Sequence, residues 1–134
     1  MANVEYFKLQ ANNLFEDWKT KFQVKYGDAI IYQYNPKYFD MDEIVCAFDV
    51  DEDNFTLMEA QDIIAILAGF EDWSDLVHAS ETNLEIGKLL LDNRDRITPD
   101  DWWMFIGSSE ELNNTTFDDE TKLGLCEMWL KEIV

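Results

Sequence analysis

The stretch Thr56–Leu91 constrains the fold most, because it divides into three helical segments separated by two clear breaks. Thr56 and Glu59 have the spacing of a capping box, which supplies hydrogen bonds to the first turn of a helix. Apolar residues then recur every three or four positions as far as Leu67, which is typical of one buried helix face. Gly69 is expected to end this helix in a left-handed conformation. A helical core is therefore predicted for the centre of the chain.

Two further helices are predicted after that break. Trp73, Leu76 and Val77 are expected to face inward from the first of them. Ser80 is expected to cap the second, whose wide apolar side consists of Leu84, Ile86, Leu89, Leu90 and Leu91. Gly87 lies in the middle of this helix, where glycine costs about 1 kcal/mol relative to alanine. We therefore expect another helix to approach the chain closely at Gly87.

The segment beginning at Ala60 resembles part of a small and largely uncharacterised family of bacterial helical proteins; it reads AQDIIAILAGFEDWSDLVHASETNLEIGKLLLDN. Proteins of that family also open with an aromatic-rich helix of the type YFKLQANNLFEDWKT, found here at residues 6–20. A similar AGF-x-x-W-x-x-L module occurs beside glyoxalase-superfamily proteins, and the LAGF turn looks like the helix corner of ubiquitin-associated domains. The resemblance covers about half of the chain. It implies that Gly69 turns the chain and that Phe70 and Trp73 pack, and it implies no catalytic residue.

The remainder of the chain also favours helices. Residues 3–22 carry an apolar stripe and are predicted to form the first helix, with Trp18 in the core beside Ile63, Ile64, Leu67, Phe70 and Trp73. Residues 29–34 alternate Ile and Tyr and are predicted to be extended. Their partner would be Ile44–Val50 in a hairpin. The alternative, which we prefer, is a short helix over that stretch, capped by Asp40.

The C-terminal third opens with a strong helix start at Thr98-Pro99, where a hydroxyl cap precedes a proline in the first helical position. Adjacent tryptophans cannot share one helix face, so one of Trp102 and Trp103 is expected in the core and the other at the surface. Gly107 is expected to end this helix. A final helix is predicted from Asp118, with Leu123, Cys126, Met128, Trp129 and Ile133 available for packing.

A chain of 134 residues with 47% hydrophobic and 14% aromatic residues can bury a substantial core. No repeat or linker divides it. The sequence therefore predicts one compact domain spanning residues 1–134. This domain is mainly all-α, with about six helices and room for one short extended segment or hairpin near residues 29–50.

The charge is strongly and unevenly acidic. There are 29 acidic against 10 basic residues, for a net charge of -19. From Tyr38 to Gly87 there are 14 Asp or Glu and no Lys or Arg. Direct nucleic-acid binding is excluded, because phosphate contacts require clustered Lys and Arg, and an anionic membrane surface would repel the chain. Solubility alone remains the alternative explanation of the charge.

No metal or cofactor site is predicted. A calcium loop starting at Asp49 would need Gly at its sixth position and Glu at its twelfth, but Asn54 and Ala60 stand there. His78 is the one histidine, and the sequence places no catalytic partner beside it. The glycines are scattered and form no phosphate loop. We therefore expect a protein that is not an enzyme.

Cys46 and Cys126 are expected to be buried free thiols, as is usual in a reducing compartment. The N-terminus has no apolar core of the signal-peptide type, and no run approaches the eighteen or so apolar residues of a membrane span. A cytoplasmic protein of bacterial or phage origin is expected.

Two functional hypotheses remain. The first is an acidic inhibitor that occupies the basic cleft of a nucleic-acid-processing enzyme, as DNA mimics, anti-restriction, anti-CRISPR, immunity and antitoxin-like proteins do. Its partner would be a basic protein, met by carboxylates at helix starts and in one loop: Asp40, Asp42, Glu43, Asp49, Asp51, Glu52, Asp53, Glu71, Asp72 and Asp75. The second is a non-catalytic scaffold or regulatory module that binds a protein through the LAGF corner and an exposed aromatic such as Trp102 or Trp103.

Overall fold

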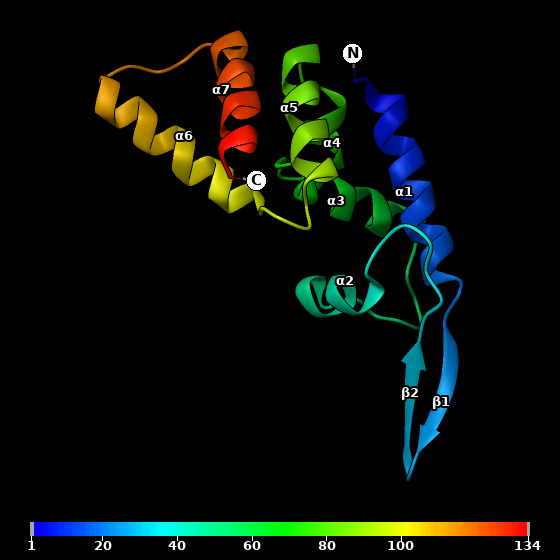
Figure 1. Ribbon diagram of the computed structural model, residues 1–134. Coiled ribbons are helices and arrows are strands. Elements are labelled where there is room, and N and C mark those ends of the chain that lie inside the picture. Colours follow the sequence, from blue (N-terminus) through cyan, green and yellow to red (C-terminus); the bar gives the residue numbers. More distant parts are fainter. Residues whose placement is uncertain (1, 134) are drawn as a thin grey trace.

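Helices dominate the computed structural model, which describes residues 2–133 and contains seven helices and two strands in that range (Figure 1). In chain order they are α1 Val4–Trp18, β1 Phe22–Tyr26, β2 Ala29–Gln33, α2 Met41–Phe48, α3 Leu57–Leu67, α4 Trp73–Val77, α5 Glu81–Asp92, α6 Pro99–Asn113 and α7 Asp119–Glu132. The predicted all-α class is confirmed, with one helix more than the expected six. None of these helices combines the length and the hydrophobicity that crossing a bilayer requires.

The larger core lies between α1 and α3. Phe7, Ala11 and Leu14 of α1 recur at helical spacing and are fully buried against the apolar face of α3. Ile63 and Ile64 of α3 are buried, as predicted. Four other residues expected in the core pack against its rim and are half-buried: Trp18, Leu67, Phe70 and Trp73.

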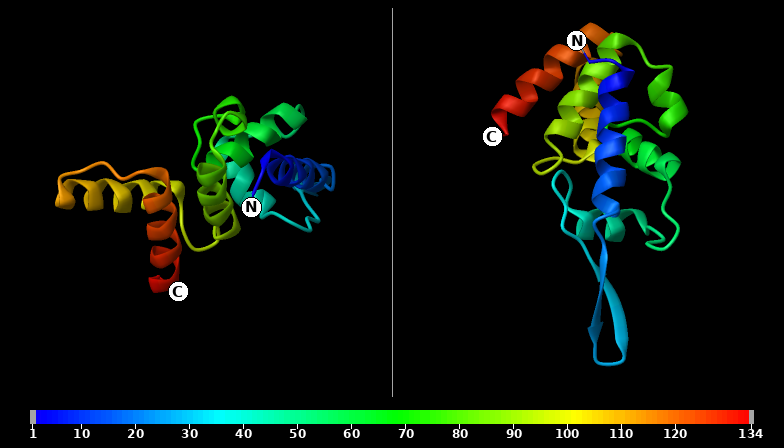
Figure 2. Two further views of the ribbon diagram at one scale, coloured as in Figure 1. Left: turned by 90° about the horizontal axis from the view of Figure 1, so that it is seen from above. Right: turned by 90° about the vertical axis from the view of Figure 1, so that its right-hand side faces the viewer.

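A smaller core joins α5, α6 and α7. Ile86 and Leu90 of α5 pack with Trp102 and Ile106 of α6 and with Cys126 of α7. The other side of α5 faces the larger core, so α5 belongs to both. In Figures 1 and 2, α6 and α7 accordingly lie on one side of α5, and α1, α3 and α4 on the other. The capping box predicted at Thr98 is present and starts α6.

The strands form one antiparallel hairpin that projects beyond the helices (Figures 1 and 2). Its register pairs Phe22 with Gln33 and Tyr26 with Ala29, around a turn in which Gly27 has a φ of 63°. The strand expected at residues 29–34 is therefore present, but its partner precedes it in sequence. The expected first helix ends four residues earlier than predicted, at Trp18, because the alternating run FQVKY that follows pairs as a strand.

The stretch 44–50, which could have been the partner strand, is helical over most of its length as α2, the alternative we preferred. Asp40 caps it, since its carboxylate accepts a hydrogen bond from the Glu43 amide at 3.2 Å. Asp49 ends it with a φ of 50°. A helix here hides Met41 and Ile44 and leaves Asp42 and Glu43 in solvent.

Asp17 joins the end of α1 to the segment before α2. Its carboxylate is buried and accepts hydrogen bonds from the backbone amides of Lys37, Tyr38 and Phe39 at 2.9, 2.9 and 2.8 Å. The neighbouring Thr20 hydroxyl donates to the Asp17 carbonyl at 2.7 Å. These bonds fix the position at which α2 begins.

The glycine expectations are partly right. Gly69 ends the α3 segment with a φ of 92°. A β-carbon at Gly87 would lie 2.9 Å from Phe70 Cε2, so the chain is approached closely there, but by the turn after α3 and not by another helix as predicted. Gly107 was expected to end α6, but it does not. The helix continues through it to Asn113, because no left-handed conformation occurs before Asn114, where φ is 49°.

Candidate functional site

The acidic loop after α2 is held in place by the hairpin and by α1. The Tyr34 hydroxyl donates to Glu52 Oε2 at 2.7 Å, and the Tyr32 hydroxyl donates to Asp53 Oδ1. The Trp18 indole donates to the Glu52 carbonyl at 2.9 Å. Burial, followed by the bond to Glu52, raises the pKa of Tyr34 above its usual range, which keeps this donor protonated. The loop is therefore ordered.

Not every carboxylate of this region is free to meet a partner. Asp51 accepts hydrogen bonds from the Asp53 amide at 3.1 Å and from the Asn54 side chain at 3.3 Å. Glu52 and Asp53 accept the tyrosine hydroxyls. Asp42, Glu43 and Asp49 are exposed, and their carboxylates have no hydrogen-bond partner within residues 2–133. These three carboxylates form the open part of the acidic surface.

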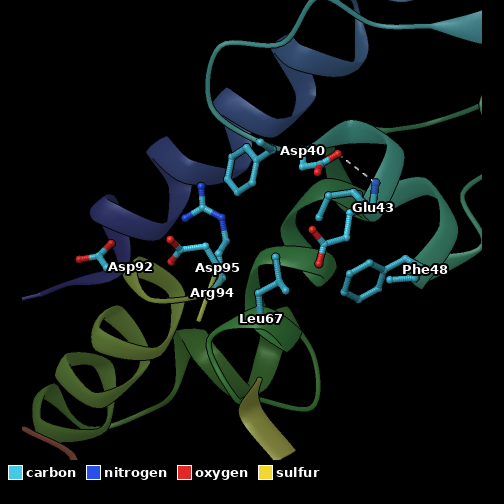
Figure 3. Close-up of a pocket in the computed structure, with 10 residues that line it drawn as sticks. Asp40, Glu43, Phe48, Leu67, Asp92, Arg94 and Asp95 are labelled. Atoms are coloured by element: carbon cyan, nitrogen blue, oxygen red, sulfur yellow. Dashed lines mark hydrogen bonds between the residues drawn. The ribbon is translucent and has the colours of Figure 1, made fainter. Parts of the chain in front are cut away.

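A cleft of about 400 Å³ lies between α2 and the turn that follows α5 (Figure 3). It brings together segments about fifty residues apart in sequence. Its charged lining consists of Asp40, Glu43, Asp92, Asp95 and Arg94, and its apolar lining of Phe39, Ile44, Ala47, Phe48 and Leu67. The lining thus combines four carboxylates and one guanidinium with an apolar surface.

Arg94 is held by groups other than these carboxylates. Its Nη2 donates to the Tyr38 carbonyl at 2.8 Å, and its Nη1 donates to the Leu91 carbonyl at 3.0 Å. The guanidinium also lies 4.4 Å from the centre of the Phe39 ring. It makes no ion pair in the described range. Arg94 therefore acts as a brace between α5 and the segment before α2.

Glu71, Asp72 and Asp75 form a second acidic group at the start of α4. Asp72 caps that helix through the Asp75 amide at 2.8 Å, and Asp75 accepts from the Glu71 amide at 3.2 Å. This group lies beyond the C-terminal end of α3, whereas the loop 49–53 precedes its N-terminal end. The 11 residues of α3 span about 16 Å along the helix axis. The ten candidate acids therefore form two clusters.

No carboxylate of the ten is neutralised by a side-chain ion pair with any Lys or Arg of residues 2–133. The ion pairs of that range are Lys8–Glu5 at 3.1 Å, Lys19–Glu16 at 3.2 Å and Lys88–Asp92 at 2.8 Å. All three join neighbouring helical turns near the surface. None of these pairs includes a carboxylate of the two acidic clusters.

The LAGF corner lies beside an exposed indole. Trp102 is 1% exposed and belongs to the smaller core, whereas Trp103 is 49% exposed, as the expectation of one buried and one surface tryptophan required. A β-carbon at Gly69 would lie 3.9 Å from Trp103 Nε1. Trp103 borders a hollow of about 290 Å³ together with Phe70, Asp75 and His78. The corner and the indole thus form one continuous surface.

Other reactive groups are isolated. His78 Nδ1 lies 2.7 Å from the Ser74 carbonyl, which is a bond within its own helix region. No three His, Cys, Asp or Glu side chains of residues 2–133 are arranged to hold a metal ion. Cys126 is buried as predicted, but Cys46 is exposed. The prediction for Cys46 was wrong because α2 is covered on one side only and Cys46 lies on its open side. Val77 is likewise exposed rather than inward.

Three charged residues of the cleft were absent from the sequence-based candidates. Asp92, Arg94 and Asp95 follow the base-free run and meet α2 only through the tertiary fold. A local signal for them does not exist, because their spacing from Asp40 is set by how α5 packs on α3. No protein-family model, curated protein or solved structure matches the chain, and its resemblance to a bacterial helical family stays an expectation.

Proposed function

We propose that this protein is an acidic inhibitor that binds a basic protein, most specifically the nucleic-acid-binding cleft of an enzyme that processes DNA or RNA. The observation that carries the proposal is the set of carboxylates around α2, none of which makes an ion pair with a Lys or Arg of the described chain. Enzymes of this class hold phosphates with Lys and Arg. A folded surface of carboxylates can occupy the same side chains.

The cleft beside α2 supports this choice of partner, because its lining suits a long basic side chain. The aliphatic stem of a Lys or Arg would lie along Phe48 and Leu67, while its cationic end would reach Glu43 or Asp95. Such side chains combine an apolar stem with a charged head. A cleft lined in this way therefore favours a cationic partner over an anionic one.

The order of the acidic surface favours binding in a second way. Tyr32, Tyr34 and Trp18 hold the loop before any partner arrives, so less conformational entropy is lost on association. The charge also increases the association rate and suppresses binding to acidic proteins. The increase in association rate and the discrimination against acidic proteins both weaken with salt, because exposed charges are screened within about 8 Å at physiological ionic strength.

The test compares two quadruple variants. The first neutralises open or loop carboxylates near the cleft: Asp42→Asn, Glu43→Gln, Asp49→Asn and Asp51→Asn. The control removes the same charge from exposed acids of α6 and α7: Glu111→Gln, Glu120→Gln, Glu127→Gln and Glu132→Gln. Each immobilised protein is used to capture partners from a lysate of the source organism, and the association rate of the captured protein is then measured at several salt concentrations.

We expect the parent and the control to retain the same basic protein, and DNA or RNA to compete with its binding. The cleft variant should associate at least tenfold more slowly at low salt, with a smaller difference at high salt. Equal association of both variants at every salt concentration would contradict the proposal, as would a captured protein that neither DNA nor RNA displaces.

A scaffold or regulatory module is the second candidate, and the position of Trp103 favours it. An exposed indole beside the Gly69 turn and a hollow is the arrangement in which aromatic residues dominate binding energy. Trp103→Ala would then weaken binding by about 2 kcal/mol or more, with little dependence on salt. Under the inhibitor proposal the same change leaves the association rate close to that of the parent.

A further inference from the structure

The hairpin β1–β2 has no covering layer. Tyr26 is 79% exposed and Ile30 is 61% exposed, and almost every residue of both strands faces solvent. The hairpin extends away from the helices (Figures 1 and 2). Tyr32 of β2 and Tyr34, just after β2, donate hydrogen bonds to the acidic loop. A two-stranded hairpin is at best marginally stable in water. Pairing with further strands would stabilise the hairpin.

The two edges of this ribbon differ. β1 carries Lys25 and is preceded by Lys21, and lysine on an edge strand is a common protection against pairing with another chain. β2 reads AIIYQ and has no charge, no proline and no bulge. Its outer backbone groups have no backbone partner in the described chain, because the sheet ends at β2. β2 is therefore the edge that is open to another strand.

The local charge identifies what can pair there. Residues 20–36 hold Lys21, Lys25 and Asp28, a net charge of 2 − 1 = +1 in a chain whose total is -19. Two copies that meet through any acidic surface repel each other strongly. Two copies that meet through the hairpin bring two segments of net charge +1 together, so negative charges do not face each other there. This is the part of the molecule where self-association costs least.

We propose that β2 pairs antiparallel with β2 of a second copy, forming a symmetric dimer with a four-stranded sheet in the order β1-β2-β2-β1. A twofold axis at Ile31 aligns all five residues of the strand, so that Ile31 meets its own counterpart and Ile30 meets the counterpart of Tyr32. The Ile31 side chain lies on the face opposite Tyr32, because side chains alternate along a strand. The Ile31 pair at the axis therefore lies on the face away from the Tyr32 bond to the acidic loop.

The first test is the mass of the parent protein. Sedimentation equilibrium from about 1 µM to about 1 mM covers association free energies from about -8 to about -4 kcal/mol. We expect the mass to rise towards twice that of the monomer, and to do so at lower protein concentration when salt is added, because salt screens the repulsion between the two bodies. A monomer throughout the range, at low and high salt, overturns the proposal.

The second test uses the symmetry. Ile31→Lys places two like charges opposite each other at the axis, and Ile31→Glu does the same with the opposite sign, so each variant alone should be monomeric. An equimolar mixture should restore a dimer, because Lys then faces Glu. Leu112→Lys, at an exposed position of α6, is the control and should dimerise like the parent. Circular dichroism checks that each variant is folded.

A dimer that persists in both single variants, or a mixture that stays monomeric while the parent dimerises, contradicts this arrangement. The salt effect also separates this inference from the inhibitor proposal. Dimerisation strengthens with salt, whereas binding to a basic partner weakens. Either can therefore fail without the other.

Discussion

Asp17 is the one charged side chain buried among residues 2–133, and three backbone amides offset the cost of burying it. No sequence pattern marks it, since it sits among exposed and core residues of α1 like any other acid. Its partners at residues 37–39 are about twenty positions away. Its role was therefore not predictable from local chemistry, although it decides where α2 and the acidic surface begin.

Asp17→Ala should lower the free energy of unfolding by about 2–4 kcal/mol, because three amides lose a charged acceptor and the Phe39 amide stays buried. Asp17→Asn should cost less, since the amide oxygen still accepts. The control is Asp95→Ala, which removes an exposed carboxylate that has no hydrogen bond in the described chain. Urea unfolding measures all three, and an unchanged midpoint for Asp17→Ala would show that water replaces the carboxylate.

Alkaline pH should destabilise the fold through buried groups that hold their protons. Burial, with the nearby Glu127 charge, raises the pKa of the Cys126 thiol from 9.0 to about 12. Burial, followed by the bond to Asp92, raises the pKa of Tyr6 above its ordinary 10.0. Burial, followed by the bond to Glu52, raises the pKa of Tyr34 in the same way. The folded state therefore binds these protons more tightly than the unfolded state. This stability is complete below pH 9 and is lost as the pH rises towards about 12.

Urea unfolding between about pH 8 and about pH 11 checks this dependence. We expect the free energy of unfolding to fall steadily across the upper part of the range. Cys126→Ala and Tyr34→Phe should each reduce the slope, because neither replacement can lose a proton. A flat profile in the parent would mean that these groups titrate alike in both states.

At the scale of the elements, the sequence predicted helix starts better than helix ends. Four helices begin where the sequence predicted, at the caps Thr98, Asp40, Ser80 and Asp118, because each cap is a local bond between a side chain and the amide three residues on. Strand β1 was missed because Phe22 also fits the apolar stripe of α1. The two-residue Gly27–Asp28 turn, flanked by alternating residues, was the available signal.

Glycine substitutions in two helices should have opposite effects. Gly87→Ala places a β-carbon 2.9 Å from Phe70 Cε2 and 3.3 Å from the Ala68 carbonyl, so overpacking should cost about 1–3 kcal/mol. Gly107→Ala meets no atom within 4 Å and should stabilise α6 by about 0.5–1 kcal/mol. Thermal or urea unfolding compares them. Stabilisation by both changes would show that α5 can move away from the turn at Phe70.

At the scale of the whole molecule, most of the negative charge lies outside the hairpin. The candidate acids 40–53 lie in and around α2, while the lysines of the first forty residues lie in or near α1 and the hairpin. Composition predicted the acidic surface, since 14 acids without a base cannot be hidden in a core. The cleft itself required tertiary structure, because it joins Glu43 to Asp95 across two helices.

Salt should stabilise the monomer. Repulsion among the acidic side chains at a net charge of -19 destabilises the folded state. The three surface ion pairs of residues 2–133 contribute little stability, so screening them by salt removes little. Sodium chloride at about 0.5 M should therefore raise the free energy of unfolding by about 1 kcal/mol, or the thermal midpoint by roughly 4 °C. Dilute samples keep association out of the measurement. A falling midpoint would mean that attractive pairs outweigh repulsion.

The unequal exposure of the two thiols gives the protein a natural reporter. Cys46 is exposed on α2, on the same helix as Asp42 and Glu43, whereas Cys126 is fully buried. A thiol-reactive fluorophore should therefore attach at Cys46 alone while the protein is folded, without any engineered cysteine. Its emission would change when a partner covers α2. Because Cys46 belongs to α2 and not to β2, a change in emission that the monomeric variant Ile31→Lys also shows would report the partner rather than the dimer.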